Sequence, residues 1–271
     1  MTNTAIDFTS IKAAQRTGWE TGDYTRVGNT LQIIAELLVE AADVQAGERV
    51  LDVACGQGNA AIAAALRFAE ATGLDYAAPL LARGRDRATA ASVPVTFVEG
   101  DAEELPFPAE SFDAVLSTVG VMFAPDHRKA AAELVRVTEV GGRIAVASWT
   151  PEGMVGAMFR TVGAFAPPPA GVRPATLWGT EAHLQELFGD RVAWTFTKRH
   201  YVFRYRSPEH FSEWFRRYYG PITRLSGALS EDDLARFSAE LADVARRYDK
   251  APGDTLAAPA EYLEAVGVRL Y

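Results

Sequence analysis

The sequence predicts an α/β fold of the doubly wound type, with a mostly parallel sheet and helices on both faces. Two observations lead to this class. Short apolar segments alternate with amphipathic segments between about residues 49 and 149, and this rhythm is typical of strands joined by crossover helices. The chain also has 271 residues, of which 48% are hydrophobic, so it can bury a core without disulfides or metals. Its single cysteine, Cys55, excludes an intramolecular disulfide.

The N-terminal part of the chain is predicted to be helical. Residues 9–18 favour a first helix, and residues 27–43 favour a stronger one. In the second segment Leu31, Ile34, Leu37 and Leu38 follow the i, i+3, i+6, i+7 spacing of one helix face. These helices precede the first strand and are expected to form a cap on the sheet domain.

The alternating part of the chain then supplies five strands and the helices between them. The strands are predicted at residues 49–54, 71–75, 93–98, 111–118 and 143–149. Of the intervening helices, the first follows the glycine-containing loop and ends near residue 69, and the other two cover residues 78–91 and 126–137. Asp126 is expected to cap the last of these helices, because its carboxylate can accept a hydrogen bond from a free N–H group of the first turn.

The rhythm of the sequence changes after residue 150. The segments that follow are two helices within residues 151–190, a long strand over 192–206, a helix from Ser207, a helix over 230–248 and a last strand over 262–271. Ser207 followed by Pro208 is a typical helix start, with the serine as N-cap and the proline at the first helical position. We expect these segments to extend one domain rather than to form a second.

The most informative stretch is the loop Cys55-Gly56-Gln57-Gly58, which follows the first strand. Because glycine has no Cβ, such a loop lets a ligand approach the backbone closely. The loop also opens a helix, whose first N–H groups are free. Gly56 to Ala61 fits the G-x-G-x-x-[GA] pattern of dinucleotide-binding proteins, with Asp75 about 20 residues further on. The loop alone is therefore compatible with several ligands that contain a ribose.

Three carboxylates near the loop discriminate between these candidate ligands. Asp52, Asp75 and Asp101 lie in or after the first three strands, and the carboxyl ends of parallel strands meet at one edge of the sheet. These charges would repel a pyrophosphate, whereas they would attract a cationic ligand. Asp75 can bind a ribose diol in either case, so the discrimination depends on Asp52 and Asp101. The sequence therefore favours a cationic nucleoside over a dinucleotide.

S-adenosylmethionine fits this description, since it carries a sulfonium, an ammonium and a ribose but no phosphate. The sequence resembles the class I S-adenosylmethionine-dependent methyltransferases over about residues 45–150, and most of all their ubiquinone/menaquinone-type branch of small-molecule enzymes. The motifs that carry the resemblance are Val50 to Gly58, Gly73-Leu74-Asp75, Gly100-Asp101-Ala102 and Ser111 to Ser117. The resemblance implies a Rossmann-like fold with a seven-stranded sheet whose last strand is antiparallel.

The resemblance also implies which residues bind this cofactor. The positions that match the family's cofactor-binding motifs are Asp52, Ala54, Gly56, Gly58, Asp75, Tyr76, Asp101, Ala102, Ser117 and Phe123. The glycine loop would surround the methionyl part, Asp75 would bind the ribose hydroxyls, and Tyr76 would lie beside the adenine. Ala54 departs from the family pattern, which often has glycine there. No metal is expected.

On the same resemblance, residues 1–271 are expected to form one methyltransferase domain. Its parts are an N-terminal helical cap (1–45), a cofactor-binding core (46–150), inserted helical segments over the acceptor site (151–190 and 207–260) and the last sheet strands (191–206 and 261–271). The inserted segments are expected to form a lid.

Methyl transfer from a sulfonium is an in-line displacement, for which a protein supplies mainly alignment and a pocket. A base is needed only where the acceptor is protonated. His127, after the fourth strand, is the candidate base, and the alternative is an exposed residue in the first turn of a helix. The aromatic residues expected to line the acceptor pocket are Trp19, Tyr24, Trp149, Tyr218 and Tyr219. They favour an apolar acceptor, aromatic or isoprenoid-like; for those on the helix after Pro208, packing in the core is the alternative.

Two further functions stay open at this point. One is an NAD(P)-dependent oxidoreductase, and the other is an S-adenosylmethionine-binding protein that does not methylate. The net charge of −8, all of it within residues 1–150, argues against a nucleic-acid partner. The basic and aromatic segment Lys198 to Arg206 is compatible with an anionic ligand, with single-stranded nucleic acid or with a charged edge strand.

The sequence also bears on location and partners. Met1 to Asp7 have neither the basic nor the apolar region of a signal peptide, and no stretch of about 18 apolar residues occurs. We therefore expect a cytoplasmic protein of secondary metabolism that acts on a small molecule, without membrane insertion. A homodimer is an open option.

Overall fold

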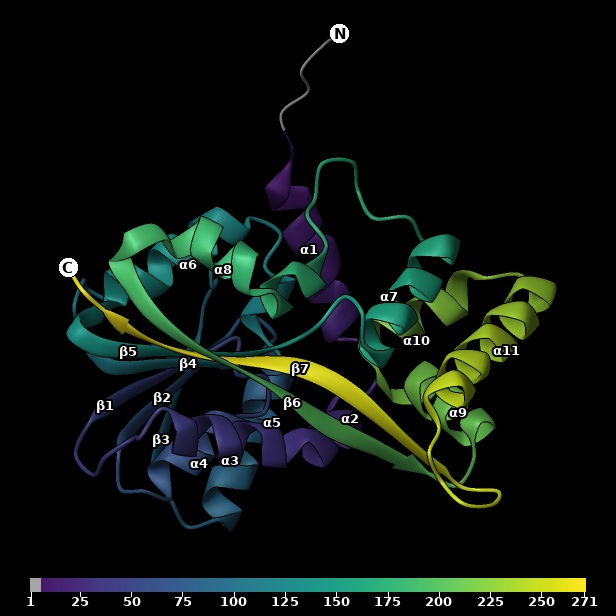
Figure 1. Ribbon diagram of the computed structural model, residues 1–271, viewed down its shortest axis with the longest axis horizontal. Coiled ribbons are helices and arrows are strands. Elements are labelled where there is room, and N and C mark those ends of the chain that lie inside the picture. Colours follow the sequence, from purple (N-terminus) through teal and green to yellow (C-terminus); the bar gives the residue numbers. More distant parts are fainter. Residues whose placement is uncertain (1–5) are drawn as a thin grey trace, which may run out of the picture.

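The sheet at the centre of the molecule has seven strands in the order β3–β2–β1–β4–β5–β7–β6 (Figure 1). The strands are β1 (Arg49–Val53), β2 (Glu70–Asp75), β3 (Val95–Glu99), β4 (Phe112–Thr118), β5 (Thr138–Trp149), β6 (Val192–Tyr205) and β7 (Leu256–Arg269). The computed structural model describes residues 6–271, so the first five residues of the predicted cap lie outside it. Strands β1 to β5 pair in parallel, and β7 is antiparallel to both its neighbours. The predicted fold class, including the antiparallel last strand, is confirmed.

Helices cover both faces of the parallel part of the sheet (Figure 1). One face carries α3 (Gln32–Ala41), α4 (Asn59–Ala65) and α5 (Ala78–Ala90), and the other carries α6 (His127–Val137) and α8 (Glu181–Phe188). Ile34 and Leu38 of α3 are buried, as their helical spacing predicts. Leu37 is exposed instead, because it points about 100° away from Leu38 around the helix axis. Asp126 caps α6 by accepting a hydrogen bond from the N–H of Lys129. The core therefore lies on both sides of the sheet.

Four further helices lie beside the end of β6 and the beginning of β7, at the right of Figure 1. They are α7 (Met154–Phe165), α9 (Pro208–Tyr218), α10 (Gly220–Ala228) and α11 (Glu231–Tyr248). Ser207 caps α9 by accepting a hydrogen bond from the N–H of His210, and Ser230 caps α11 in the same way through Asp233. Both helices therefore begin where the sequence predicts.

The N-terminal helices differ from their prediction. The helix predicted over residues 27–43 is divided into α2 (Thr25–Gly28), the 3₁₀ turn η1 (Asn29–Leu31) and α3. Gly28 and Asn29 are weak helix formers, which favours the change of helix type at this point. Gly28 is also tightly packed, because a Cβ there would lie 2.8 Å from the side-chain nitrogen of Gln57 in the glycine loop.

Two segments of the second half also differ from their prediction. Helix α10 was not predicted, since Gly220-Pro221 resembles a turn, although proline is equally suited to the first turn of a helix. Strand β7 begins at Leu256 rather than at residue 262. Pro259 counts against a strand, but here β7 pairs with β6 alone, so the missing N–H breaks no ladder with β5.

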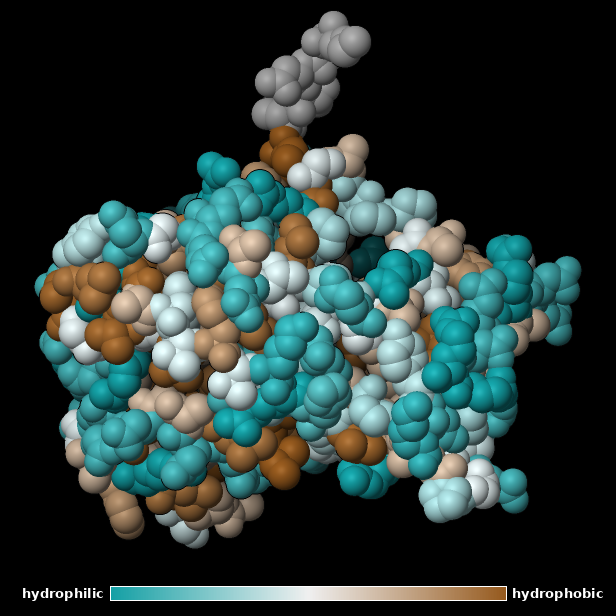
Figure 2. Space-filling model, in the orientation of Figure 1, coloured by the Kyte–Doolittle hydropathy of each residue, from teal (hydrophilic) through white to brown (hydrophobic). Residues whose placement is uncertain are grey.

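The face of the molecule in Figure 2 is mostly hydrophilic, and its hydrophobic residues occur in small groups. Exposed apolar side chains near the C-terminus include Val268, Leu270 and Tyr271. Isolated groups of this size are ordinary for a globular surface. Among residues 6–271, no helix combines the length and the apolar character needed to cross a membrane.

Candidate functional site

A cavity opens at the edge of the sheet where the first four strands end. The loops after β1, β2, β3 and β4 form its walls, and α1 (Phe8–Trp19) contributes Lys12 and Trp19. Its volume is about 840 Å³, the open space at its mouth included, which is in the range of small-molecule sites. Eight of the ten residues expected at a cofactor site line it: Asp52, Ala54, Gly56, Asp75, Tyr76, Asp101, Ala102 and Phe123.

The loop after β1 takes its shape from two glycines. Gly56 (φ +55°) and Gly58 (φ +79°) are both in the left-handed conformation, which glycine adopts without strain. Gly58 does not line the cavity, because the Phe97 ring packs against it; a Cβ at residue 58 would lie 2.8 Å from that ring. Gly58 thus makes the turn into α4, whereas Gly56 presents bare backbone to the cavity.

Asp75, at the end of β2, holds this loop in place. One carboxylate oxygen accepts a hydrogen bond from the N–H of Gly56, and the other accepts one from the N–H of Ala77, each at 2.8 Å. A carboxylate oxygen has two lone pairs, so each oxygen keeps one for a ligand hydroxyl. The carboxylate therefore fixes the glycine loop and offers two neighbouring acceptors, which suits a ribose diol.

Asp52 lies deeper in the same cavity and is only 2% exposed. It accepts a hydrogen bond from the N–H of Ala61 at 3.0 Å, in the first turn of α4. Burial raises the pKa of Asp52 to about 7, and the charge of Asp75 adds to the rise. Within residues 6–271 it has no cationic partner, so a cationic ligand would stabilise its ionised form.

We expect the affinity for S-adenosylhomocysteine to fall as the pH is lowered from 7.5 to 5.5. Ionised Asp52 attracts the ammonium group of this ligand, and protonation below a pKa of about 7 removes that attraction. Calorimetric titrations across this range measure the effect. Asp52→Asn should bind more weakly at pH 7.5 and lose most of the dependence. An unchanged pH dependence in this variant would assign the effect to another group.

Asp101 lies at the mouth of the cavity beside Lys12, a cation that the sequence motifs did not indicate. Lys12 of α1 is 2.5 Å from Asp101 and 2.9 Å from the buried carboxylate of Glu103. Arg16, one turn further along α1, is 2.7 Å from Glu99 at the end of β3. The three predicted carboxylates do share one cavity, but Lys12 offsets the charge of Asp101, so the attraction for a cation rests mainly on Asp52 and Asp75.

The resemblance implied that Ser117 faces the cofactor, but in the structure its neighbour Thr118 lines the cavity instead. Ser117 is fully buried and does not line the cavity; its hydroxyl donates to the carbonyl of Val53 at 2.7 Å and accepts from the N–H of Val121 at 2.8 Å. It therefore ties β4 to β1. Thr118 lines the cavity instead, and its buried hydroxyl has no hydrogen-bond partner among residues 6–271. An unpartnered buried hydroxyl is costly, so it favours a ligand at this wall.

The backbone is strained at two residues of the cavity wall. Ala54 (φ +52°) and Val119 (φ +53°) adopt the left-handed conformation, which costs a residue with a Cβ about 1–2 kcal/mol. For the β-branched Val119 this is a clear outlier. Both residues line the cavity, and strain of this kind gathers at functional sites. Ala54 thus adopts the conformation that explains why glycine is frequent at this position in the family.

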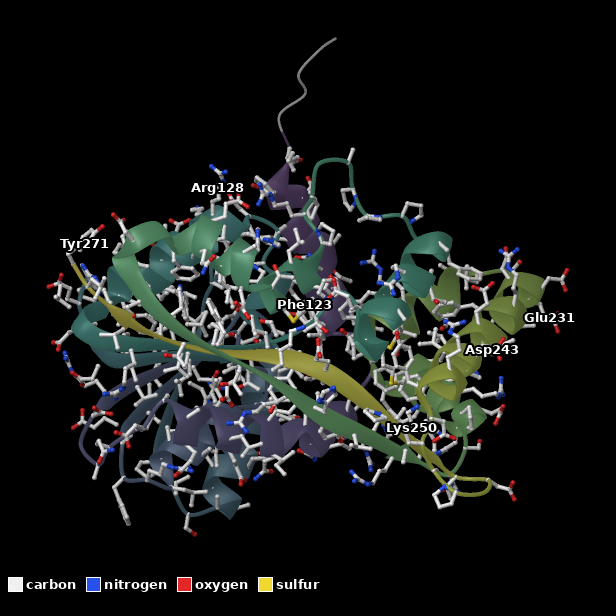
Figure 3. The ribbon with its side chains drawn as sticks, viewed as in Figure 1. Phe123, Arg128, Glu231, Asp243, Lys250 and Tyr271 are labelled. Carbon is white, nitrogen blue, oxygen red and sulfur yellow. The ribbon has the colours of Figure 1, made fainter. Side chains whose placement is uncertain are left out.

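A second, apolar cavity adjoins the first; its volume is about 310 Å³, the open space at its mouth included. Its walls are formed by Tyr24, Val27, Leu31, Val119, Phe123, Trp149, Val155, Met158, Phe159, Phe203, Phe215 and Tyr219. Tyr24, Val119 and Phe123 line both cavities. Phe123 lies near the middle of the view in Figure 3, whereas Glu231 and Asp243 of α11 lie at its right-hand side.

The aromatic residues predicted at the acceptor site divide into two groups. Trp19 packs against Tyr24 and Tyr219 with ring centroids 5.4 and 5.3 Å apart, at the junction of the cavities. Trp149 lines the apolar cavity. Tyr218 lies outside both, against Trp214 and beneath the guanidinium of Arg217. Tyr218 is the last residue of α9, whereas Tyr219 follows it with an extended backbone, and only Tyr219 lines the apolar cavity.

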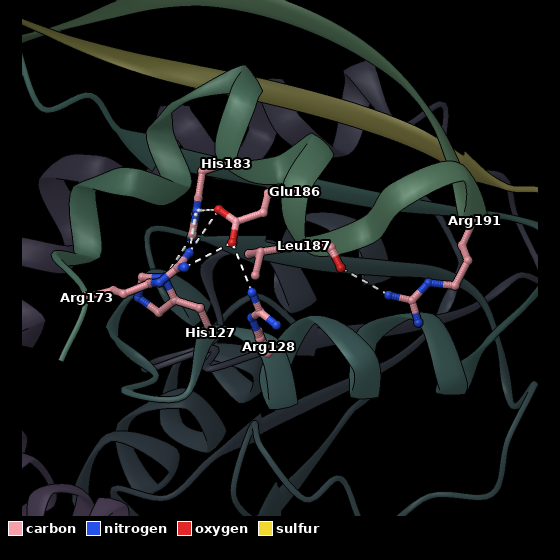
Figure 4. Close-up of polar contacts among 7 residues, drawn as sticks. All are labelled: His127, Arg128, Arg173, His183, Glu186, Leu187 and Arg191. Carbon is pink, nitrogen blue, oxygen red and sulfur yellow. Dashed lines mark hydrogen bonds and ion pairs between the residues drawn. The ribbon is translucent and has the colours of Figure 1, made fainter. Parts of the chain in front are cut away.

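His127, the predicted base, is not at either cavity. It is 3% exposed, and its Nδ1 is 2.9 Å from Nε2 of His183 on α8 (Figure 4). His183 in turn contacts Glu186, which also binds Arg128 and Arg173. The histidine pair therefore connects α6 to α8 and to the segment before it. Both the predicted catalytic role and the alternative of an exposed residue are replaced by a buried structural contact.

The pH dependence of stability should report this burial. Mainly through desolvation, with a contribution from the charge of His183, folding lowers the pKa of His127 from 6.5 to about 4. The unfolded chain then binds the proton more readily, so the contribution of neutral His127 is complete above pH 6.5 and is lost as the pH falls toward 4. In urea denaturation, His127→Gln should lose less stability than the wild type between pH 7 and pH 5. His200→Gln, at an exposed site, is the control and should follow the wild type; identical slopes for all three proteins would refute the assignment.

Among residues 6–271, no group of three or more histidine, cysteine, aspartate or glutamate side chains is arranged to bind a metal ion.

Known proteins resemble the chain in sequence and in fold. A family model described as "Methyltransferase domain" matches residues 51–146, the segment that forms most of the first cavity. An uncharacterized protein of Mycobacterium tuberculosis is 40% identical over 236 residues, which cover 85% of this chain and 86% of that protein. The demethylmenaquinone methyltransferase of Thermus thermophilus is 40% identical over 126 residues, 45% of this chain and 57% of that enzyme.

The solved structure of the YcgJ protein from Bacillus subtilis has the same fold, with a TM-score of 0.62 at 22% identity; the match covers 88% of this chain and 98% of that one. The mycobacterial relative extends the sequence similarity beyond the core to most of the chain. Together with the cavity at the strand ends, these matches identify the chain as a member of the class I S-adenosylmethionine-dependent methyltransferases.

Proposed function

We propose that the protein transfers a methyl group from S-adenosylmethionine to a small apolar acceptor. The observation that carries the proposal is the pair of adjoining cavities. One is lined by carboxylates and bare backbone, the other is apolar, and Tyr24, Val119 and Phe123 line both. A donor in the first cavity and an acceptor in the second would meet at these three residues.

The residues of the first cavity fit S-adenosylmethionine. Asp75 offers two oxygen acceptors to the ribose hydroxyls, and Asp52 offers a buried carboxylate to the ammonium group. Tyr76 and Ala102 would flank the adenine, as the family motifs imply. The unpartnered hydroxyl of Thr118 supplies one more polar group for the methionyl part. When bound, the sulfonium supplies an activated methyl group.

The aromatic rings at the junction suit the charge of the donor. Trp19, Tyr24 and Phe123 all line the first cavity, with the Trp19 ring 5.0 Å from that of Phe123 and 5.4 Å from that of Tyr24. Ring faces attract a cation within about 6 Å, so these residues would stabilise a sulfonium while excluding water from it. The chain thus contributes orientation and desolvation rather than a chemical group.

The apolar cavity argues for the type of acceptor. Its walls are formed by apolar and aromatic residues, and its side chains include no charged group. A charged group buried in this cavity away from the donor would lose its hydration without a partner. We therefore favour an aromatic or isoprenoid-like body for the acceptor. A cytoplasmic location, a role in secondary metabolism and a homodimer stay predictions from the sequence.

Two measurements test the proposal. Calorimetry should detect binding of S-adenosylhomocysteine and no binding of NAD⁺ or NADP⁺; the opposite result would favour the oxidoreductase alternative. Incubation with methyl-labelled S-adenosylmethionine and a panel of apolar aromatic compounds should then transfer the label. Binding without transfer to any apolar compound, but with transfer to compounds whose body carries charged substituents, would overturn the assignment of the acceptor.

A further inference from the structure

The polar side-chain groups of the apolar cavity are few and of one kind. They are the hydroxyls of Tyr24 and Tyr219 and the indole N–H of Trp149. All three can donate a hydrogen bond. No carboxylate, imidazole or amine stands among the lining side chains, so the cavity holds donors but no general base.

The two tyrosines are suited to act as donors throughout the working pH range. Burial raises the pKa of both, and the charge of Asp75 adds to the rise for Tyr24. The rings lie 6.0 Å apart between centroids. Their hydroxyls therefore stay protonated and cannot remove a proton from an acceptor.

The charge balance of the reaction restricts the acceptor further. A neutral amine or alcohol becomes a cation when it gains the methyl group, and it must then lose a proton, for which the cavity has no base. An anionic oxygen or sulfur of the acceptor instead donates an electron pair to the methyl carbon. The bond between this carbon and the sulfonium sulfur breaks, and its electron pair goes to that sulfur. No proton has to move. Both products are then neutral, which suits an apolar cavity.

We propose that the acceptor is an apolar molecule whose hydroxyl or thiol is ionised before the methyl group is transferred, and that the Tyr24 and Tyr219 hydroxyls bind this anion. The inference rests on the proposed function and adds the chemical class of the acceptor. The sulfonium would stabilise the anion as an opposite charge, and hydrogen bonds from neutral donors would add to this effect. The aromatic walls favour a conjugated ring as the body of the acceptor.

The experiment uses 4-nitrophenol as a probe, since it ionises near neutral pH and its anion absorbs at a different wavelength from the neutral form. The whole protein is first shown to bind S-adenosylhomocysteine, which separates a failure of the proposed function from a failure of this inference. The probe is then titrated with pH on the protein saturated with sinefungin, in which an amine replaces the methyl sulfonium. A parallel titration uses neutral S-adenosylhomocysteine.

The bound probe should ionise at least one pH unit lower with sinefungin than with S-adenosylhomocysteine. Tyr219→Phe is the decisive variant, because Tyr219 lines only the apolar cavity. It should weaken binding of the anion about 5- to 10-fold, whereas binding of S-adenosylhomocysteine is unchanged. Tyr205→Phe, which removes a buried hydroxyl outside both cavities, is the matched control.

Three results would overturn the inference. They are binding of the probe only in its neutral form, an unchanged anion affinity in Tyr219→Phe, and label transfer to benzylamine but not to 4-nitrophenol or thiophenol. A protein that binds S-adenosylhomocysteine but not the probe would count against it equally.

Discussion

Replacing Asp75 by alanine is expected to weaken binding of S-adenosylhomocysteine by about 1–3 kcal/mol, roughly 5- to 150-fold, because hydrogen bonds to a charged group are lost. Two effects add in the same direction. The variant loses the two acceptors for the ribose hydroxyls, and it frees the N–H groups of Gly56 and Ala77 that the carboxylate now holds. The glycine loop therefore loses both a ligand contact and an internal support. Calorimetry at pH 7.5 measures the change.

A matched control lies on the same strand. Glu70, the first residue of β2, is exposed at the opposite end from the cavity, so Glu70→Ala should leave the affinity unchanged. Asp75→Asn keeps the shape of the side chain but has only one acceptor oxygen, and it should fall between the wild type and alanine. Wild-type affinity in Asp75→Ala would remove the ribose assignment.

Gly120→Ala is expected to lower the free energy of unfolding by roughly 1–3 kcal/mol, the usual cost of overpacking, and to weaken cofactor binding as well. A Cβ at residue 120 would lie 2.3 Å from the carbonyl oxygen of Ala54 and 2.9 Å from its Cβ. Backbone atoms cannot move aside as a flexible side chain can. The loops after β1 and β4 would have to separate, and both line the first cavity.

Gly163 of α7 provides the control for this substitution. A Cβ there would meet no atom within 4 Å, and the residue lies inside a helix, where alanine is favoured over glycine by about 1 kcal/mol. Gly163→Ala should therefore raise the stability measured by urea denaturation and leave cofactor affinity as it is. A Gly120→Ala protein as stable as the wild type would mean that the two loops are not in firm contact.

The sequence predicts those features that depend on local chemistry. The caps at Asp126 and Ser207 follow from side chains that bond to N–H groups three residues ahead, and the structure has both. The meeting of Asp52 and Asp75 in one cavity follows from the parallel strands, whose ends share an edge. Both kinds of argument need only neighbouring residues or the direction of the strands.

Features that depend on distant partners could not be predicted in this way. Lys12 pairs with Asp101, 89 residues further along the chain, and His127 contacts His183, 56 residues away. Ser117 and Thr118 show a second limit: neighbouring strand residues point to opposite faces, so an error of one position exchanges a structural hydroxyl for one at the cavity. Tyr218 and Tyr219 show a related limit at a helix end, because the backbone leaves the helical conformation at Tyr219.

The position of the single cysteine has a practical consequence. Cys55 lies in the glycine loop, lines the first cavity and is buried, and burial raises the pKa of its thiol well above the usual value. Thiol reagents react with the thiolate, so the protein should react slowly while the glycine loop keeps Cys55 buried. Because the chain has no other thiol, its alkylation rate reports how often this loop opens. The native protein thus carries a built-in chemical reporter, which a bound nucleoside would slow and which needs no label.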